Sequence, residues 1–217
     1  MNTLLLQLAA PLQSWGTESK FERRATGREP SKSGVIGLLA AALGRRRDES
    51  LEDLVGLKFG VRVVQQGQVM MDFHIARSLK QNYVTRRYYL EDAVFLVGLE
   101  GEVAFLRMLD AAVKAPYFPL YLGRRSCPPT GRISLGIRDM SLKEALQNEP
   151  FESDAKRDEL SKMVLYLDTD EVGTYRQRDV PISFSQEHRR FTYRYIKSDV
   201  VIVGCRTEHN AFEGMGK

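Results

Sequence analysis

Short apolar runs alternate along the chain with segments whose apolar residues recur every three or four positions. Thr3–Leu8 is such a run, and because a proline-containing turn follows it, it predicts a buried strand. Ser31 or Ser33 can cap a helix that runs to Leu43, since the apolar residues then share one face and Gly44 follows as the stop. The first 45 residues therefore predict a strand followed by an amphipathic helix.

The middle of the chain continues with both kinds of pattern. Residues 48–57 predict a short helix, and residues 102–114 predict a longer one with an apolar face. Residues 57–76 alternate on either side of Gly67, which predicts a hairpin with a tight turn there. Residues 92–101 predict another buried strand, and the polar, aromatic and basic stretch before them predicts a protruding hairpin or loop.

This order of elements predicts an α+β fold with a ferredoxin-like arrangement, the layout of RNA-recognition domains. A proline-rich loop, an acidic and weakly helical stretch and three further strands complete the chain. We therefore expect a ferredoxin-like domain over 1–140 with a hairpin "thumb" at about 72–92, an acidic connector over 141–160, a small all-β portion over 161–205 and a flexible tail over 206–217.

Charge is distributed unevenly, although the net charge is only +4 and the isoelectric point is about 9.1. Residues 19–47 hold eight Lys and Arg against two acids, while 77–88 hold four and 114–138 hold five with no acid at all. Residues 139–171 carry ten acids against four bases. This separation predicts a surface that binds a polyanion and another that is solvated or faces a partner.

The first predicted helix raises the question of a phosphate site. Its free N–H groups and positive dipole end lie beside Lys32 and Ser33, with Arg24 and Arg28 just upstream. Gly34 and Gly37 would form a smooth stripe for another backbone, or would simply let the helix pack closely on the sheet. We favour a phosphate-binding edge, with tight helix packing as the alternative.

Two further segments have the composition of a nucleic-acid surface. The stretch 83–90 places tyrosines beside Arg86 and Arg87, a mixture that can stack on bases and neutralise phosphates, although a soluble edge hairpin explains it too. The stretch 121–130 combines a glycine with Arg124, Arg125 and Ser126, which can converge on an anion. Trp15 either stacks on a base or packs in the core.

Catalytic signals are weak. The three histidines and two cysteines have no metal-ligand spacing, and no nucleophile elbow or P-loop is present. Metal-independent RNA cleavage would need only a base and a cation, which His188 could supply together with Arg189 and Arg190. No apolar run is long enough to span a bilayer, so we expect a cytoplasmic protein with no membrane partner, no metal and no cofactor.

Several segments together are similar to a known family. "LLLQLAAPLQSWG", "GREPSKSGVIGLLAAALGRRRDE", "YLGRRSCPPT" and "RDVPISFSQEHRRFTYR" occur in the family's order, as do "DFHIA" and "RRYYLEDAVFLVGL". They resemble the CasD family of the type I-E CRISPR Cascade complex, in the RAMP superfamily. The basic insertion after "DFHIA" is short, which puts the length of the thumb in question.

The resemblance implies a non-catalytic subunit that caps the 5′ handle of the CRISPR RNA (crRNA) and contacts the backbone and large subunits of Cascade, with target DNA nearby. The alternative is a metal-independent endoribonuclease that processes repeat RNA, as in type I-C relatives, with His188 in catalysis. The expected RNA-binding residues, from the residue chemistry and the resemblance together, are Gln13, Ser14, Trp15, Arg24, Arg28, Lys32, Ser33, Arg77, Arg86, Arg87, Arg124, Arg125, Ser126, Arg189 and Arg190.

Overall fold

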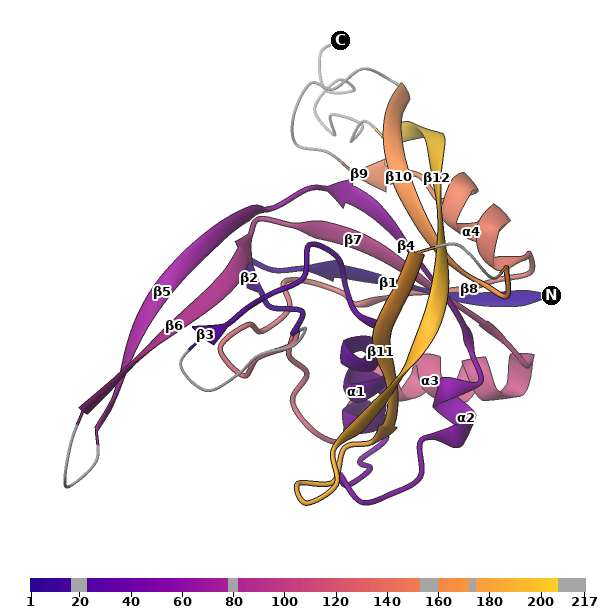
Figure 1. Cartoon of the computed structure of the whole chain (residues 1–217). Coiled ribbons are helices and arrows are strands. Elements are labelled where there is room, and N and C mark those ends of the chain that lie inside the picture. The colour runs from indigo at the N-terminus through magenta and orange to yellow at the C-terminus, as the bar shows by residue number, and fades with distance from the viewer. Residues whose placement is uncertain (17–22, 78–81, 153–159, 172–174, 207–217) are drawn as a thin grey trace, which may run out of the picture.

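A computed structural model describes residues 1–16, 23–77, 82–152, 160–171 and 175–206 (Figure 1). Its helices are α1 (Lys32–Ala42), α2 (Glu52–Val55), α3 (Val103–Lys114) and α4 (Leu142–Asn148). Its strands are β1 (Asn2–Ala9), β2 (Leu12–Gln13), β3 (Arg23–Arg24), β4 (Lys58–Gln65), β5 (Gln68–Arg77), β6 (Asn82–Glu91), β7 (Val94–Gly101), β8 (Ser134–Arg138), β9 (Phe151–Glu152), β10 (Leu160–Thr169), β11 (Tyr175–Ser183) and β12 (Arg190–Arg206).

The main sheet has the strand order β11-β12-β10-β4-β7-β1-β8, and every neighbouring pair in it is antiparallel. Within it, β8-β1-β7-β4 is the ferredoxin-like arrangement, because α1 connects β1 with β4 and α3 connects β7 with β8. The fold class predicted from the sequence is therefore confirmed. Strand β8 has no counterpart in the prediction. Its five residues have Gly136 at their centre and show little alternation of apolar and polar side chains.

Helices cover both faces of the main sheet. Helices α1, α2 and α3 lie on one face, below the sheet in Figure 1, and α4 lies on the other. A large core fills the first interface and a smaller one packs under α4. Gly60 and Gly98 are paired across β4 and β7, and a Cβ at either would lie within 3 Å of Leu146 or Leu142 side-chain atoms. This bare patch of sheet lets α4 approach closely.

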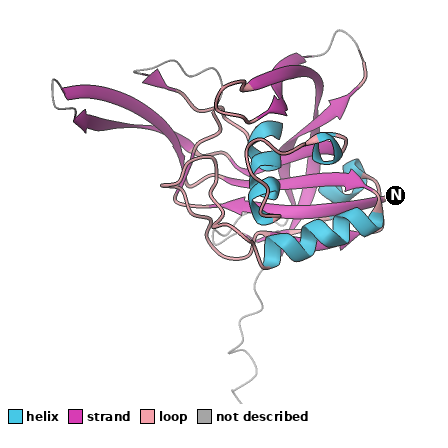
Figure 2. Ribbon diagram, turned by 90° about the horizontal axis from the view of Figure 1, so that it is seen from below, coloured by secondary structure: helices cyan, strands magenta, loops and turns pink. Residues whose placement is uncertain are grey.

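The thumb is the antiparallel pair β5–β6, which extends away from the body of the molecule in both Figure 1 and Figure 2. Its register runs from Gln68↔Glu91 to Arg77↔Asn82, so it begins four residues before the predicted start, and residues 78–81 lie outside the described part. The expected hairpin of residues 57–76 is wrong. β4 pairs with β7 and β10 in the main sheet, whereas β5 pairs with β6 in a second sheet.

Gly67 lies where the chain passes between the two sheets. A Cβ there would lie 2.5 Å from the Glu91 carbonyl oxygen, so the chain comes into close contact with the end of the thumb. The alternation of apolar residues is the same whichever partner a strand takes, and the pattern therefore does not distinguish a hairpin from this crossover.

The C-terminal strands β10, β11 and β12 extend one residue beyond each end of the predicted all-β portion, and β10 pairs with β4, so the main sheet continues across the predicted boundary. The acidic connector contributes α4 and β9, while its residues 153–159 lie outside the described part, as do residues 207–217 of the predicted tail. No helix in the described ranges is long and apolar enough to cross a membrane.

Candidate nucleic-acid interface

Three segments that are far apart in the sequence meet at the root of the thumb. β3 runs parallel to β6, with Arg23 opposite Arg86 and Arg24 opposite Arg87. The loop after α3 joins them, because the Arg124 Nη2 donates to the Arg24 carbonyl oxygen at 2.9 Å. We call Arg24, Arg86, Arg87, Arg124 and Arg125 the thumb-root cluster; within it, Arg86 and Arg87 are consecutive on β6 and so lie on opposite faces of the hairpin.

Neutral groups hold Arg124 in this cluster. Its guanidinium carbon lies 4.7 Å from the centroid of the Tyr89 ring, and that tyrosine is buried. The Tyr89 and Ser126 hydroxyls are 3.5 Å apart, so the same tyrosine also contacts the loop two residues beyond Arg124. Among the described residues no carboxylate pairs with Arg124, and its Nη1 has no hydrogen-bond partner. The charge of Arg124 is therefore not neutralised within the described chain.

The loop that carries Arg124 and Arg125 is docked on the turn after β1. Ser14 N–H donates to the Leu122 carbonyl at 3.0 Å, and the Ser14 hydroxyl donates to the Tyr88 carbonyl at 3.4 Å. Gly123 has a φ of +90°, and a Cβ there would lie 1.6 Å from the Ser14 carbonyl oxygen, so only glycine fits. The glycine of "GRRSC" thus positions both arginines against the thumb.

Gln13 and Trp15 are buried instead of exposed to a ligand. The Gln13 amide donates to the Leu8 and Ala93 carbonyls, at 3.2 and 2.6 Å, and accepts from the Trp15 indole at 3.1 Å. Trp15 is only 1% exposed, and a Cβ at Gly34 would lie 2.9 Å from its ring. In this structure the ring packs on α1 and offers no face to a base, so the packing alternative describes Trp15 and Gly34.

The N-terminus of α1 already holds a carboxylate from the same chain. The Lys32 N–H donates to Asp179 Oδ2 at 2.8 Å, and Ser31 accepts from the Gly34 N–H at 3.2 Å as the N-cap. The Lys32 ammonium is buried and donates to Asp168 and to the Leu57 carbonyl, each at 2.9 Å. The phosphate site expected at Lys32 is thus filled by Asp179, and the half-buried Ser33 lies beside that filled position.

Arg194 completes this buried network, which the sequence analysis missed. It donates to both oxygens of Asp179, at 2.7 and 2.9 Å, and to Asp168 at 2.5 Å. Burial alone would lower the pKa of Arg194, but its hydrogen bonds and charge interactions with the two carboxylates raise it above the usual value. The only sequence signal was polar residues inside otherwise apolar strands, which does not identify the partners.

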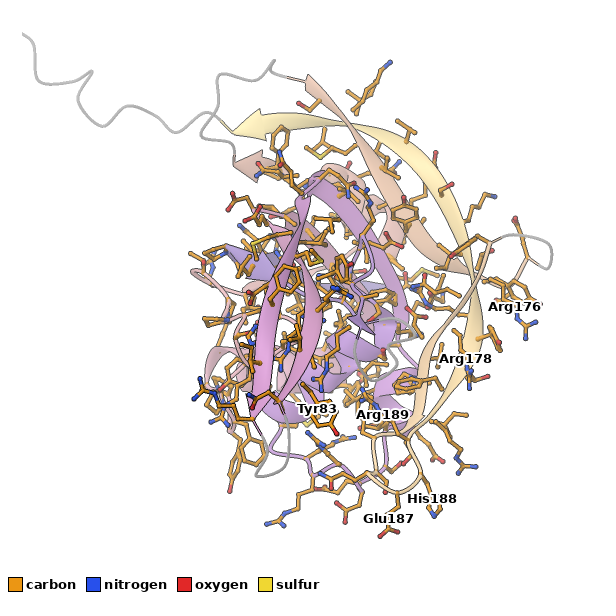
Figure 3. All side chains as sticks on the ribbon, turned by 60° about the vertical axis from the view of Figure 1, so that its left-hand side comes forward. Tyr83, Arg176, Arg178, Glu187, His188 and Arg189 are labelled. Carbon is orange, nitrogen blue, oxygen red and sulfur yellow. The ribbon has the colours of Figure 1, made fainter. Side chains whose placement is uncertain are left out.

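The exposed candidates lie at three places. Arg24, Arg86, Arg125 and Ser126 are exposed at the thumb root, with Arg87 half-buried there and Arg28 exposed four residues after Arg24. Arg77 is exposed near the thumb tip, and Arg189 and Arg190 are exposed where β11 turns into β12. Tyr83 is 45% exposed and is the thumb tyrosine with the most accessible ring (Figure 3). The structure places the first group around the thumb root, on both faces of the hairpin, and leaves the other two at separate extremities.

His188 lies in the turn before β12. Figure 3 shows Glu187 and His188 at the tip of this hairpin with their side chains directed away from the body of the protein. His188 is exposed and makes no hydrogen bond or ion pair within the described ranges. Among those same residues, no group of three or more His, Cys, Asp or Glu side chains could hold a metal ion.

Comparisons with known proteins agree along most of the chain. Residues 3–197 match the family model for CRISPR-associated protein (Cas_Cas5). The chain is 35% identical over 181 residues to the CRISPR system Cascade subunit CasD of Escherichia coli (strain K12), covering 72% of this chain and 81% of that one.

Two solved structures are also similar. One is described as the crystal structure of a Cas protein and is 44% identical, with a TM-score of 0.75 and coverage of 92% of this chain and 94% of that chain. The other belongs to a CRISPR RNA-guided surveillance complex and is 34% identical, with a TM-score of 0.80 and coverage of 93% and 91%.

Proposed function

This chain belongs to the family of CRISPR-associated proteins described as Cas_Cas5, and from that membership we propose that it is a non-catalytic RNA-binding subunit of a Cascade-type complex. Its relatives include a Cascade subunit and a chain of an RNA-guided surveillance complex, each covered over most of its length. In the proposed role, the chain binds and caps the 5′ handle of the crRNA.

The observation that carries the proposal is the thumb-root cluster. Arginines from three distant segments meet at the thumb root, with Arg124 on the face of Tyr89 and Arg86 on the opposite face, and none has a described carboxylate partner. Such groups neutralise phosphates and fix the register of a bound strand. Ser14 supports the loop of Arg124 and Arg125 through its hydrogen bond to the Leu122 carbonyl, while Gln13 and Trp15 are packed in the core beside it. Tyr83, which is 45% exposed, is the thumb tyrosine proposed to stack on a base.

We further propose that one side of the thumb contacts the backbone subunit of the complex. Val69, Met71, Phe73 and Ile75 alternate along β5, so they share one face, and each is at least 42% exposed. Val84 lies opposite Ile75 on the same face. An exposed apolar strip of this kind suits a protein partner. The large subunit and target DNA nearby complete the proposed surroundings.

The test uses the purified chain, labelled CRISPR repeat RNA and EDTA, with native and denaturing gels run on the same sample. We expect a mobility shift on the native gel and intact RNA on the denaturing gel. A discrete cut that disappears in His188→Ala would replace this proposal with the metal-independent endoribonuclease. If the isolated chain gives neither a shift nor a cut, the proposal that the chain alone binds the RNA is overturned.

Matched variants connect the shift to the cluster. Arg86→Ala and Arg125→Ala remove exposed guanidiniums from two different segments of the cluster, whereas Arg107→Ala removes an equally exposed guanidinium from α3. We expect the first two to weaken the shift and the third to leave it unchanged. Equal weakening by all three would indicate a nonspecific effect of net charge.

A further inference from the structure

A second cationic site lies on the face of the main sheet that α4 covers, opposite the face covered by α1, α2 and α3, and beside the smaller core. It is a pocket of about 270 Å³ between β1, β4, β7 and the segment that joins α4 to β9. Its polar lining comes from Gln7, Arg62, Arg132, Arg138 and Glu149, and Phe151 closes part of its apolar wall. None of these residues belongs to the thumb-root cluster.

Arg62 is the unusual member of this lining. The residue is 1% exposed, yet its Nη1 donates only to the neutral carbonyl oxygens of Leu146 and Glu149, each at 2.6 Å. Its Nε is buried and has no acceptor in the described part of the chain. Burial lowers the pKa of Arg62 to about 10, with the charge of Glu149 opposing that effect.

The other charges do not neutralise Arg62. Arg138 binds the Glu149 carboxylate through two hydrogen bonds, at 2.9 and 2.8 Å, so that pair is satisfied internally. Arg132 is exposed and forms no ion pair with any described residue. Three guanidiniums less one carboxylate leave two positive charges around the pocket.

We propose that this pocket binds the phosphate group of a small ligand, either free phosphate or the terminal phosphate of a nucleotide. A phosphate dianion matches the two uncompensated charges, whereas a single carboxylate would leave one of them unmatched. Arginine donates in a planar fork that suits such oxyanions, and a buried cation gains from an anion that satisfies its remaining donor. The volume is at the small end for ligand pockets, which fits a phosphate or a mononucleotide.

The pocket is independent of the proposed RNA surface. It is lined by residues of the α4 face, and none of the thumb-root cluster contributes to it. Binding of phosphate here would neither require nor establish capture of the 5′ handle, so each proposal can fail alone.

The test is isothermal titration calorimetry of inorganic phosphate into the full-length chain at constant ionic strength. Arg132→Gln removes an exposed guanidinium that the core does not need, and we expect it to weaken binding at least tenfold. Glu149→Gln removes the opposing negative charge, and we expect it to tighten binding. Arg107→Gln, on α3, is the matched control and should bind as the unaltered chain does.

Parallel titrations separate the sources of the phosphate. Adenosine monophosphate or a 5′-phosphorylated pentaribonucleotide binding more tightly than inorganic phosphate would identify a nucleotide end, and the reverse order would identify free phosphate. The proposal is overturned by no saturable heat, by equal binding in Arg132→Gln, or by acetate binding as tightly as phosphate. The last result would point to a carboxylate of a protein partner.

Discussion

Arg194 on β12 binds both carboxylate oxygens of Asp179 on β11, and one of those oxygens also accepts the first N–H of α1. The same arginine and Lys32 share Asp168 on β10. One buried network of two cations and two anions thus connects the C-terminal strands to the first helix. It satisfies the helix terminus without any external anion.

We expect Asp179→Asn to lower the free energy of unfolding by about 3 kcal/mol, because Arg194 and Lys32 would then share the single carboxylate of Asp168 and one buried positive charge would be uncompensated. Urea unfolding monitored by circular dichroism measures the change. The exposed Asp170→Asn is the control and should stay within about 0.5 kcal/mol of the unaltered chain. Equal stability of the two variants would mean that the network contributes nothing.

Gly34 and Gly37 should respond in opposite directions to alanine. Gly34→Ala places a Cβ 2.9 Å from the Trp15 ring, and we expect a loss of about 1–3 kcal/mol from overpacking. At Gly37 the Cβ would meet only Phe184, at 3.7 Å, so better helix propensity should stabilise by about 0.5–1 kcal/mol. Thermal unfolding gives the sign of each change. Stabilisation by both substitutions would contradict the packing of Trp15 on α1.

The thumb-root arginines should show the signature of phosphate contacts. For Arg125→Ala we expect RNA affinity to fall for every sequence, and the slope of log K against log salt to decrease by about one. Fluorescence anisotropy from 50 to 300 mM salt measures both quantities. An affinity loss that depends on sequence, with an unchanged slope, would indicate contact with a base instead.

Glu29 should make stability depend on pH. Burial raises the pKa of Glu29, with Asp179 adding to the effect and Arg194 and Arg28 opposing it. The folded state therefore binds this proton more tightly than the unfolded chain, so stability falls as pH rises from the ordinary glutamate pKa to the raised one. Glu29→Gln carries no charge at any pH and should be more stable than the unaltered chain at pH 7, with the difference disappearing toward pH 4.

Chemical unfolding at several pH values tests this expectation. Glu187→Gln serves as the control, since Glu187 is exposed in the turn before β12. A stability difference for Glu29→Gln that stays constant from pH 4 to 8 would contradict the assignment to its ionisation.

Elements whose periodicity is local were predictable from the sequence. The apolar run of β1 and the helical spacing of α3 depend only on neighbouring residues, and both elements occur where they were expected. The partner of β5 was not predictable, because pairing is decided by contacts with β6 and not by the strand's own pattern.

The same distinction holds for the candidate site. Arg124, Arg125 and Ser126 were identified because their chemistry and their glycine lie within one short stretch. Lys32 was assigned to a ligand because its true partners lie far away, with Asp179 147 positions along the chain. Burial of Trp15 likewise depends on α1, which follows it by 17 residues or more. Residue type predicts what a side chain can bind, and distant contacts decide whether it is available.

The insertion point of the thumb has an evolutionary consequence. β4 and β7 are neighbours in the main sheet, and the whole hairpin leaves and re-enters the fold between their adjacent ends. An arm attached in this way can lengthen, shorten or change its surface without altering the register of the strands beneath it. The length and surface of the arm can therefore change while the four-stranded scaffold beneath it keeps its register.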